Sequence, residues 1–178
     1  MSGSWKFATA SIIGTSHQKS PGGVCQDSHA AAYLESATAF IGIVSDGAGS
    51  ASHAHIGSRL TCDVILREAD AAEPAGLFTE AFARDTVEKL RAVLFKEADS
   101  KELTISDFAC TMLVAIVSNE RASFWQVGDG AICARDELGS IQLHLLAGEV
   151  RLRQYHLLCH GSPRTGGDAG NPARKGDS

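Results

Sequence analysis

Short apolar runs of strand length lie towards both ends of the chain, and longer stretches with helical spacing lie between them. The short runs before the middle of the chain predict strands over residues 6–13, 29–35 and 39–44. Apolar residues at helical spacing predict two helices, over about residues 52–69 and 77–98, with Ser50 or Ser52 as the cap of the first. Further strands are predicted over residues 108–117, 123–127, 131–135 and 141–146.

The spacing of these elements predicts the fold class. The four later strands are joined by short turns, at Asn119-Glu-Arg, Gly128-Asp-Gly130 and Asp136-Glu-Leu-Gly139, which is typical of an antiparallel meander. Strands, then two helices, then strands again indicate an α+β protein, because a parallel sheet would need strands and helices to alternate.

The length and the end of the chain predict one domain with a different tail. A chain of 178 residues corresponds to one domain, and its strand and helix patterns stop at about residue 146. Residues 147–178 show no sustained period, and residues 161–178 contain no Val, Ile, Leu, Met, Phe, Trp or Tyr. Such a segment buries too little surface to offset its ordering entropy, so we expect a disordered tail after a domain at residues 1–146.

Composition excludes several classes of protein. The 16 Lys and Arg against 21 Asp and Glu give a net charge of −5, which does not suit nucleic-acid binding. No apolar run reaches the ~18 residues of a membrane span, and the first residues do not resemble a signal peptide. The five cysteines are far apart, and we expect reduced thiols, mostly in the core, in a cytoplasmic protein.

The sharpest chemical signal is Val44-Ser-Asp46-Gly47-Ala-Gly-Ser50, which joins a buried strand to a helix. A carboxylate at a strand end beside an open glycine backbone suits a hard divalent cation, held by Asp46 and the Gly47 carbonyl. Two alternatives stay open here. Asp46 caps the helix while Gly47 makes a tight turn, or the glycine loop and the helix N-terminus bind a phosphate.

Other polar residues are weaker candidates on spacing alone. Asp27 precedes the second strand and is a possible second carboxylate of the same site, although a surface turn explains it as well. His17 and Lys19, in the preceding loop, are candidate contacts for a phosphate group. Asp107 opens a later strand and is a further candidate metal ligand. Asp129 lies in an Asp-Gly turn, where a structural role is expected.

Four of these segments, in this order, resemble the type-2C, metal-dependent (PPM-type) protein serine/threonine phosphatases, in a bacterial branch. They are Gly14-Thr-Ser-His-Gln-Lys with Cys25-Gln-Asp27, the Asp46-Gly47 motif, Phe108-Ala-Cys-Thr111, and Val127-Gly-Asp129-Gly-Ala. The similarity covers residues 5–146.

The resemblance implies an antiparallel β-sandwich flanked by helices, with two Mg²⁺ or Mn²⁺ ions at one edge. It also implies that water activated by these ions attacks the phosphorus of phosphoserine or phosphothreonine in a protein substrate. Asp46 and the Gly47 carbonyl would bridge the metals, Asp27 would bind through water, and His17 or Lys19 would face the phosphate.

The chain departs from the family pattern after Leu146. The late Asp-Gly and Asp-Asn metal motifs are missing, and only Asp168 and Asp177 follow in the tail. We therefore expect a domain that is incomplete at its C-terminus, and we hypothesise a truncation or frameshift. Three functions remain open: an active phosphatase, an inactive remnant that binds phosphoproteins, and an unrelated Gly-loop phosphate- or nucleotide-binding module.

Overall fold

The fold is seen in a computed structural model of the chain, which describes residues 6–15, 23–135, 141–145 and 151–156. Its main sheet has five strands in the order β1-β2-β3-β4-β7, and every neighbouring pair is antiparallel. The strands are β1 (Ser28–Leu34), β2 (Ala39–Ser45), β3 (Met112–Val117), β4 (Arg121–Val127) and β7 (Arg151–His156). A separate two-stranded sheet contains β5 (Ala131–Arg135) and β6 (Ile141–Leu145).

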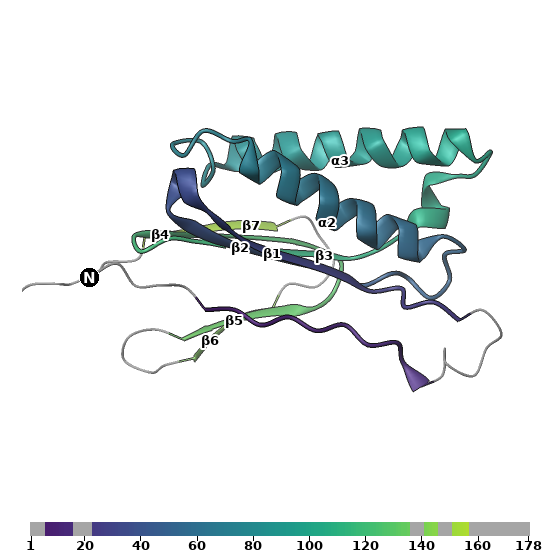
Figure 1. Cartoon of the computed structure of the whole chain (residues 1–178), viewed down its shortest axis with the longest axis horizontal. Helices are drawn as coiled ribbons and strands as arrows, with labels where there is room; N and C mark the ends of the chain where they lie inside the picture. The colour runs from purple at the N-terminus through teal and green to yellow at the C-terminus, as the bar shows by residue number, and fades with distance from the viewer. Residues whose placement is uncertain (1–5, 16–22, 136–140, 146–150, 157–178) are drawn as a thin grey trace, which may run out of the picture.

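Two helices, α2 (Ala54–Asp70) and α3 (Glu80–Ser100), cover one face of the main sheet, and β5 and β6 lie beyond its other face (Figure 1). Short 3₁₀ turns occupy Glu35–Ala37 and Ile105–Phe108. The predicted α+β class, with an antiparallel sheet and two helices, is confirmed. None of the helices described is long and apolar enough to cross a membrane.

The core lies between the sheet and the helices because β2 and β3 alternate buried and more exposed positions. On β2, Ile41 and Ile43 are buried, whereas Val44, on the opposite face, is 52% exposed. On β4, Trp125 faces the helices and meets Phe82 of α3 edge to face, with ring centroids 5.6 Å apart. Burial of this apolar layer supplies most of the driving force for folding.

Residues 6–14 form no strand, although the sequence predicts one over residues 6–13. The segment is apolar, but an apolar run becomes a strand only when a neighbouring backbone completes its hydrogen bonds. Instead it crosses the face of the main sheet opposite the helices, where the rings of Phe7 and Phe40 lie 5.3 Å apart.

The predicted meander is confirmed for the β3–β4 and β5–β6 pairs and is wrong between them, because β4 and β5 do not pair. β3 and β4 do pair around the turn at Ser118–Arg121, but β4 next pairs with β7, while β5 pairs with β6. The turn between β4 and β5 contains Gly128 and Gly130, both with positive φ, and it carries the chain from one sheet to the other.

β7 (Arg151–His156) lies inside residues 147–178, for which the sequence predicts a disordered tail. An edge strand needs only a backbone ladder with its neighbour, here β4, so its side chains need not show a period. Residues 157–178, which make up most of the predicted tail, lie outside the described part of the chain.

Two further predictions change in detail. The first helix begins at Ala54 after His53, and its N-cap residue makes no side-chain hydrogen bond, so Ser50 and Ser52 are not its cap. The Ser52 hydroxyl donates to Asp107 instead. Of the four described cysteines, all of them free thiols, only Cys62 is buried, so the expectation that most lie in the core is wrong.

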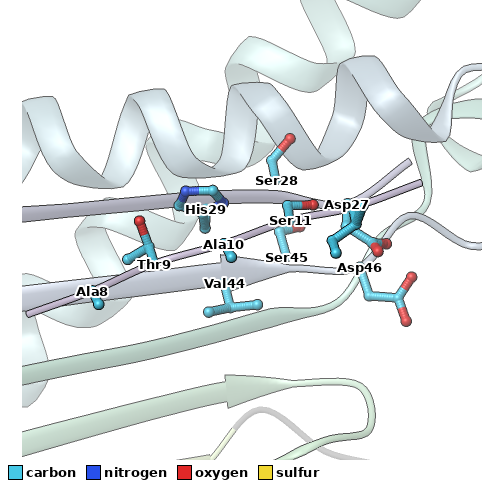
Figure 2. Close-up of a pocket in the computed structure, with 11 residues that line it drawn as sticks. Ala8, Thr9, Ala10, Ser11, Asp27, Ser28, His29, Val44, Ser45 and Asp46 are labelled. Carbon is cyan, nitrogen blue, oxygen red and sulfur yellow. The ribbon is translucent and has the colours of Figure 1, made fainter. Parts of the chain in front are cut away.

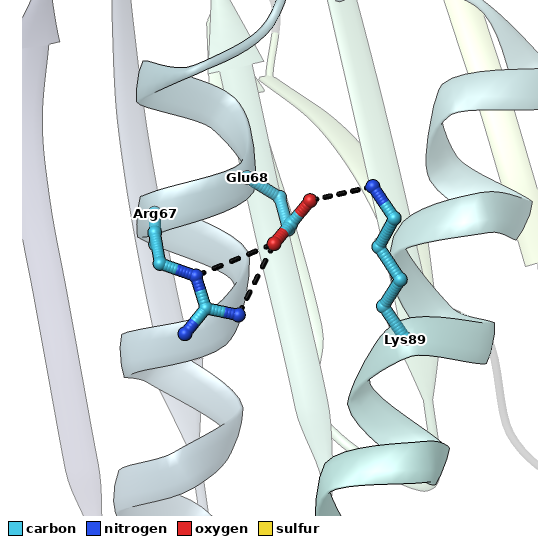
Figure 3. A network of polar contacts seen from close by, with 3 residues as sticks. All are labelled: Arg67, Glu68 and Lys89. Atoms are coloured by element: carbon cyan, nitrogen blue, oxygen red, sulfur yellow. Dashed lines mark hydrogen bonds and ion pairs between the residues drawn. The ribbon is translucent and has the colours of Figure 1, made fainter.

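An ion-pair network joins the two helices on their outer side (Figure 3). Glu68 of α2 accepts hydrogen bonds from Lys89 of α3, at 2.7 Å, and from Arg67, at 3.1 and 3.3 Å. The Glu68 side chain is 17% exposed, whereas those of both cations are mostly exposed. The hydrogen bonds from Lys89 and Arg67 lower the pKa of Glu68 below its ordinary range.

We expect Glu68→Gln to lower the free energy of unfolding by about 0.5–1 kcal/mol at pH 7, because the ionised pair is lost. A lowered folded-state pKa stabilises the protein above the unfolded-state pKa, and this contribution disappears as the pH falls through the folded-state value. Urea unfolding at pH 7 and at acid pH measures both effects. Glu80→Gln, which breaks a more exposed pair within α3, is the control and should change stability less. An equal loss of unfolding free energy at both pH values would show that the ionised Glu68 carboxylate is not what stabilises the protein.

Candidate metal centre

The register of the first hairpin places Asp27 opposite Asp46. In the β1–β2 ladder, Ser28 pairs with Ser45, and the pairing runs without a break to Leu34 and Ala39. One step beyond Ser28 and Ser45, the same register sets Asp27 across from Asp46. The Cα atoms of directly opposed residues in an antiparallel pair lie about 4.5–5.5 Å apart. The side chains of Asp27 and Asp46 are therefore neighbours.

Figure 2 shows both acidic side chains at the same end of a groove. This groove, of about 460 Å³, is lined by residues 8–12 together with Asp27, Val44 and Asp46, among others. A second cavity, of about 300 Å³, is lined by Asp27, Asp46 and Gly47. Asp27 and Asp46 therefore lie where two solvent-filled spaces meet, and both residues are exposed.

The two carboxyl groups act on each other. The pKa of Asp46 is raised by partial burial, then by a hydrogen bond with the Asp27 carboxyl, and then by the negative charges of Asp27 and Asp129. A raised pKa means that negative charge at Asp46 is disfavoured without a counter-ion. A cation bound between the two carboxylates would remove this repulsion.

Gly47 fits its place only as glycine. A Cβ atom at this position would lie 2.6 Å from the Gln26 carbonyl oxygen and 2.8 Å from the Ala54 Cβ. Gln26 therefore packs directly against Gly47, which is buried. This close packing keeps the loop after β2 beside Asp27.

These residues fit part of a site for a hard divalent cation. Two carboxylates and the Gly47 carbonyl offer oxygen ligands, which Mg²⁺ and Mn²⁺ prefer, and the adjoining cavity leaves space for coordinating water. Within the described residues, however, no group of three or more His, Cys, Asp or Glu side chains is arranged to hold a metal. The site as described relies on two acidic side chains.

The other predicted site residues are placed differently. Asp107 closes a capping box: its carboxylate accepts hydrogen bonds from the Thr104 backbone and hydroxyl and from the Ser52 hydroxyl. Those bonds lower the pKa of Asp107, and both of its oxygens already have protein donors. Among the described residues, Asp107 forms no metal-binding group of three side chains with Asp27 and Asp46. His17 and Lys19 lie outside the described residues.

Asp129 is closer to the site than its turn motif indicates. The sequence assigns it a structural role in a hairpin, but its charge contributes to the raised pKa of Asp46. The β4–β5 connection brings it there, because it leaves the main sheet at the end where β2 also ends (Figure 1). An Asp-Gly turn does not reveal this, since its place depends on which sheet the next strand joins. Asp46 itself does not cap α2, because the N-cap is His53.

We expect Gly47→Ala to lower the free energy of unfolding by about 1–3 kcal/mol, because its Cβ meets backbone and not a flexible side-chain end. Gly49→Ala is the matched control, because a Cβ at Gly49 meets nothing within 4 Å. Urea denaturation of the two variants measures the difference. Equal effects would show that Gly47 is not tightly packed.

We expect Asp46→Asn to raise the urea midpoint of the metal-free protein slightly at pH 7. A raised folded-state pKa gives stability that is present at low pH and is lost as the pH rises through that value, and Asn does not ionise. The increase in urea midpoint of Asp46→Asn over the wild type should therefore become smaller as the pH falls. Asp85→Asn, at an exposed site on α3, is the control. A loss of stability at pH 7 would contradict the repulsion between Asp27 and Asp46.

Comparison with known proteins places the chain in a family. The family model described as protein phosphatase 2C matches residues 13–151. Serine/threonine-protein phosphatase 3 of Escherichia coli (strain K12) is 35% identical over 154 residues, or 82% of this chain and 60% of that protein. The chain thus spans about three fifths of the length of this relative.

Solved structures agree in fold. A variant of a bacterial serine phosphatase superposes with a TM-score of 0.63 at 15% identity, covering 88% of this chain and 74% of that one. RsbX in complex with magnesium gives a TM-score of 0.53 at 14% identity, covering 75% and 60%. Stp1 from Staphylococcus aureus gives 0.56 at 16% identity, covering 75% and 50%. With its sequence and its fold in agreement, the chain belongs to the protein phosphatase 2C family.

Proposed function

We propose that the chain hydrolyses phosphoserine and phosphothreonine in proteins with the help of Mg²⁺ or Mn²⁺ at Asp27, Asp46 and Gly47. The observation that carries this proposal is the meeting of the Asp27 and Asp46 carboxyl groups at the junction of two cavities. Family membership supports the same reaction class. The substrate is a phosphorylated protein, and the cell compartment we propose is the cytoplasm.

Each residue has a distinct part in this proposal. Asp46 and the Gly47 carbonyl would hold the cation, and Asp27 would bind it through water. When bound, divalent cations neutralise charge on the phosphoryl oxygens and make water a better nucleophile. Water adds to phosphorus, the bond from phosphorus to the serine or threonine oxygen breaks, and that oxygen leaves as the alcohol with a proton. We also propose His17 or Lys19 as a contact for the substrate phosphate.

A second candidate is a phosphoprotein-binding protein without hydrolytic activity. It is favoured by one observation: within the described residues, two carboxylates converge and no third metal-ligating side chain joins them. A family site with two ions needs more negative charge than two aspartates supply. The third candidate, a nucleotide-binding module unrelated to phosphatases, does not fit a chain of this family.

The test is a phosphatase assay on a phosphothreonine peptide with and without Mn²⁺. We expect phosphate release that requires Mn²⁺ and that falls at least 100-fold in Asp46→Asn, because the central oxygen ligand is weakened. Asp85→Asn on α3 should keep full activity.

Melting experiments, together with the phosphatase assay, distinguish a phosphoprotein-binding protein from an active phosphatase. Mn²⁺ at about 100 times its Kd should stabilise the wild type by ~2.7 kcal/mol and Asp46→Asn much less. Stabilisation by Mn²⁺ without phosphate release would favour a binding protein. If Mn²⁺ neither stabilises the wild type nor supports phosphate release, the metal site itself is contradicted.

A further inference from the structure

Two hydroxyl groups hold the backbone on either side of the acidic pair, from elements outside the β1–β2 hairpin. Thr111 lies just before β3, and Ser58 lies in the second turn of α2. Neither side chain offers a charge to a cation. Their hydrogen bonds are nevertheless made mainly to the backbone of Asp46 and to the residues next to Asp27 and Asp46.

Thr111 holds the Asp46 segment by three hydrogen bonds. The Asp46 amide donates to the Thr111 hydroxyl at 2.9 Å, and the Thr111 amide donates to the Asp46 carbonyl at 2.7 Å. The hydroxyl of Ser45, which is fully buried, donates to the Thr111 carbonyl at 2.6 Å. Backbone bridging continues one step on, because Gly47 pairs with Cys110.

Ser58 holds the Asp27 segment from the other side. Its hydroxyl is buried and donates to the Gln26 carbonyl at 2.6 Å, and it lies 3.1 Å from the Ser28 hydroxyl. Ser58 therefore contacts the residue before Asp27 and the residue after it. The Asp27 side chain itself stays exposed.

The arrangement matters because the two carboxylates repel each other when no cation is bound. Hydrogen bonds to the flanking backbone fix the position from which each acidic side chain extends, and none of these bonds uses a carboxylate oxygen. A site held in this way loses little freedom when a cation enters, so more of the interaction energy is available as affinity.

We propose that Thr111 and Ser58 are positioning residues, which hold Asp46 and Asp27 at the separation that a divalent cation requires. This inference rests on the proposed function, since it concerns the same cation. It goes further by assigning the preorganisation of the site to two residues that do not touch the metal.

The experiment compares Mn²⁺ affinity, measured by the paramagnetic resonance signal of free Mn²⁺, with urea stability measured without metal. Thr111→Val and Ser58→Ala should each weaken Mn²⁺ binding about 10- to 100-fold, the usual effect of removing a group that orients a ligand. Thr111→Ser keeps the hydroxyl and should stay within about threefold of the wild type.

Matched controls separate positioning from general stability. Thr86→Val and Ser123→Ala remove buried hydroxyl groups from α3 and β4, away from the acidic pair. They should lose stability and keep their Mn²⁺ affinity. The inference is overturned if the controls lose as much affinity as Thr111→Val and Ser58→Ala do, or if those two variants bind as the wild type does.

Amide hydrogen exchange without metal keeps this inference separate from the proposed function. Exchange at the Asp46 amide should rise at least tenfold in Thr111→Val and stay near the wild-type rate in Thr111→Ser. A wild type that binds no Mn²⁺ would overturn the proposed function. The exchange rate of the Asp46 amide would still show whether Thr111 holds the Asp46 backbone. Unchanged exchange in Thr111→Val would overturn its positioning role. If Thr111→Val does not fold, Ser58→Ala and Thr111→Ser decide the question by affinity.

Discussion

The register of the β1–β2 hairpin is the constraint on which the candidate site depends. It sets two acidic residues opposite each other at the open end of the ladder, where their charges repel. Packing and hydrogen bonds in the rest of the structure offset this repulsion. The α2–α3 layer buries the other face of both strands, and the Asp46 loop is fixed to the segment before β3. A cation is the natural complement of such a pair, and the protein phosphatase 2C family is one in which metal ions act on phosphate esters.

The scaffold and the site are built from the same strands, which explains why the site can be rigid and open together. Ile41 and Ile43 anchor β2 in the core, and the strand then ends in exposed Asp46 and buried Gly47. On the face away from the helices, residues 8–12 and β5–β6 cover the sheet only in part among the residues described. The groove beside Asp27 follows from that partial second layer.

Much of this arrangement can be predicted from the sequence, and the failures have physical causes. Periodicity locates α2, α3 and the strands that build the core, because burial imposes a period on them. Asp27 and Asp46 are equally far from the centre of one hairpin, so their meeting follows from local pairing. The path of residues 6–14, the pairing of β7 with β4 and the separation of β5 from β4 depend on contacts between distant segments, and no local pattern records those contacts. The same applies to Asp129. Ser58 escapes notice because a single buried hydroxyl on a helix has no sequence signature. The capping box of Asp107 could not be told from a metal ligand, because capping and metal binding use the same side chain.

The proposed metal centre requires Asp27 and Asp46 to hold a hard cation jointly. The most direct measurement is a crystal structure of the chain grown with Mn²⁺, using the anomalous scattering of the metal. We expect an anomalous peak between the two carboxylates and beside the Gly47 carbonyl, with oxygen ligands at about 2.0–2.6 Å. Saturating Mn²⁺ with no peak at this position, or carboxylates turned away from each other, would contradict it.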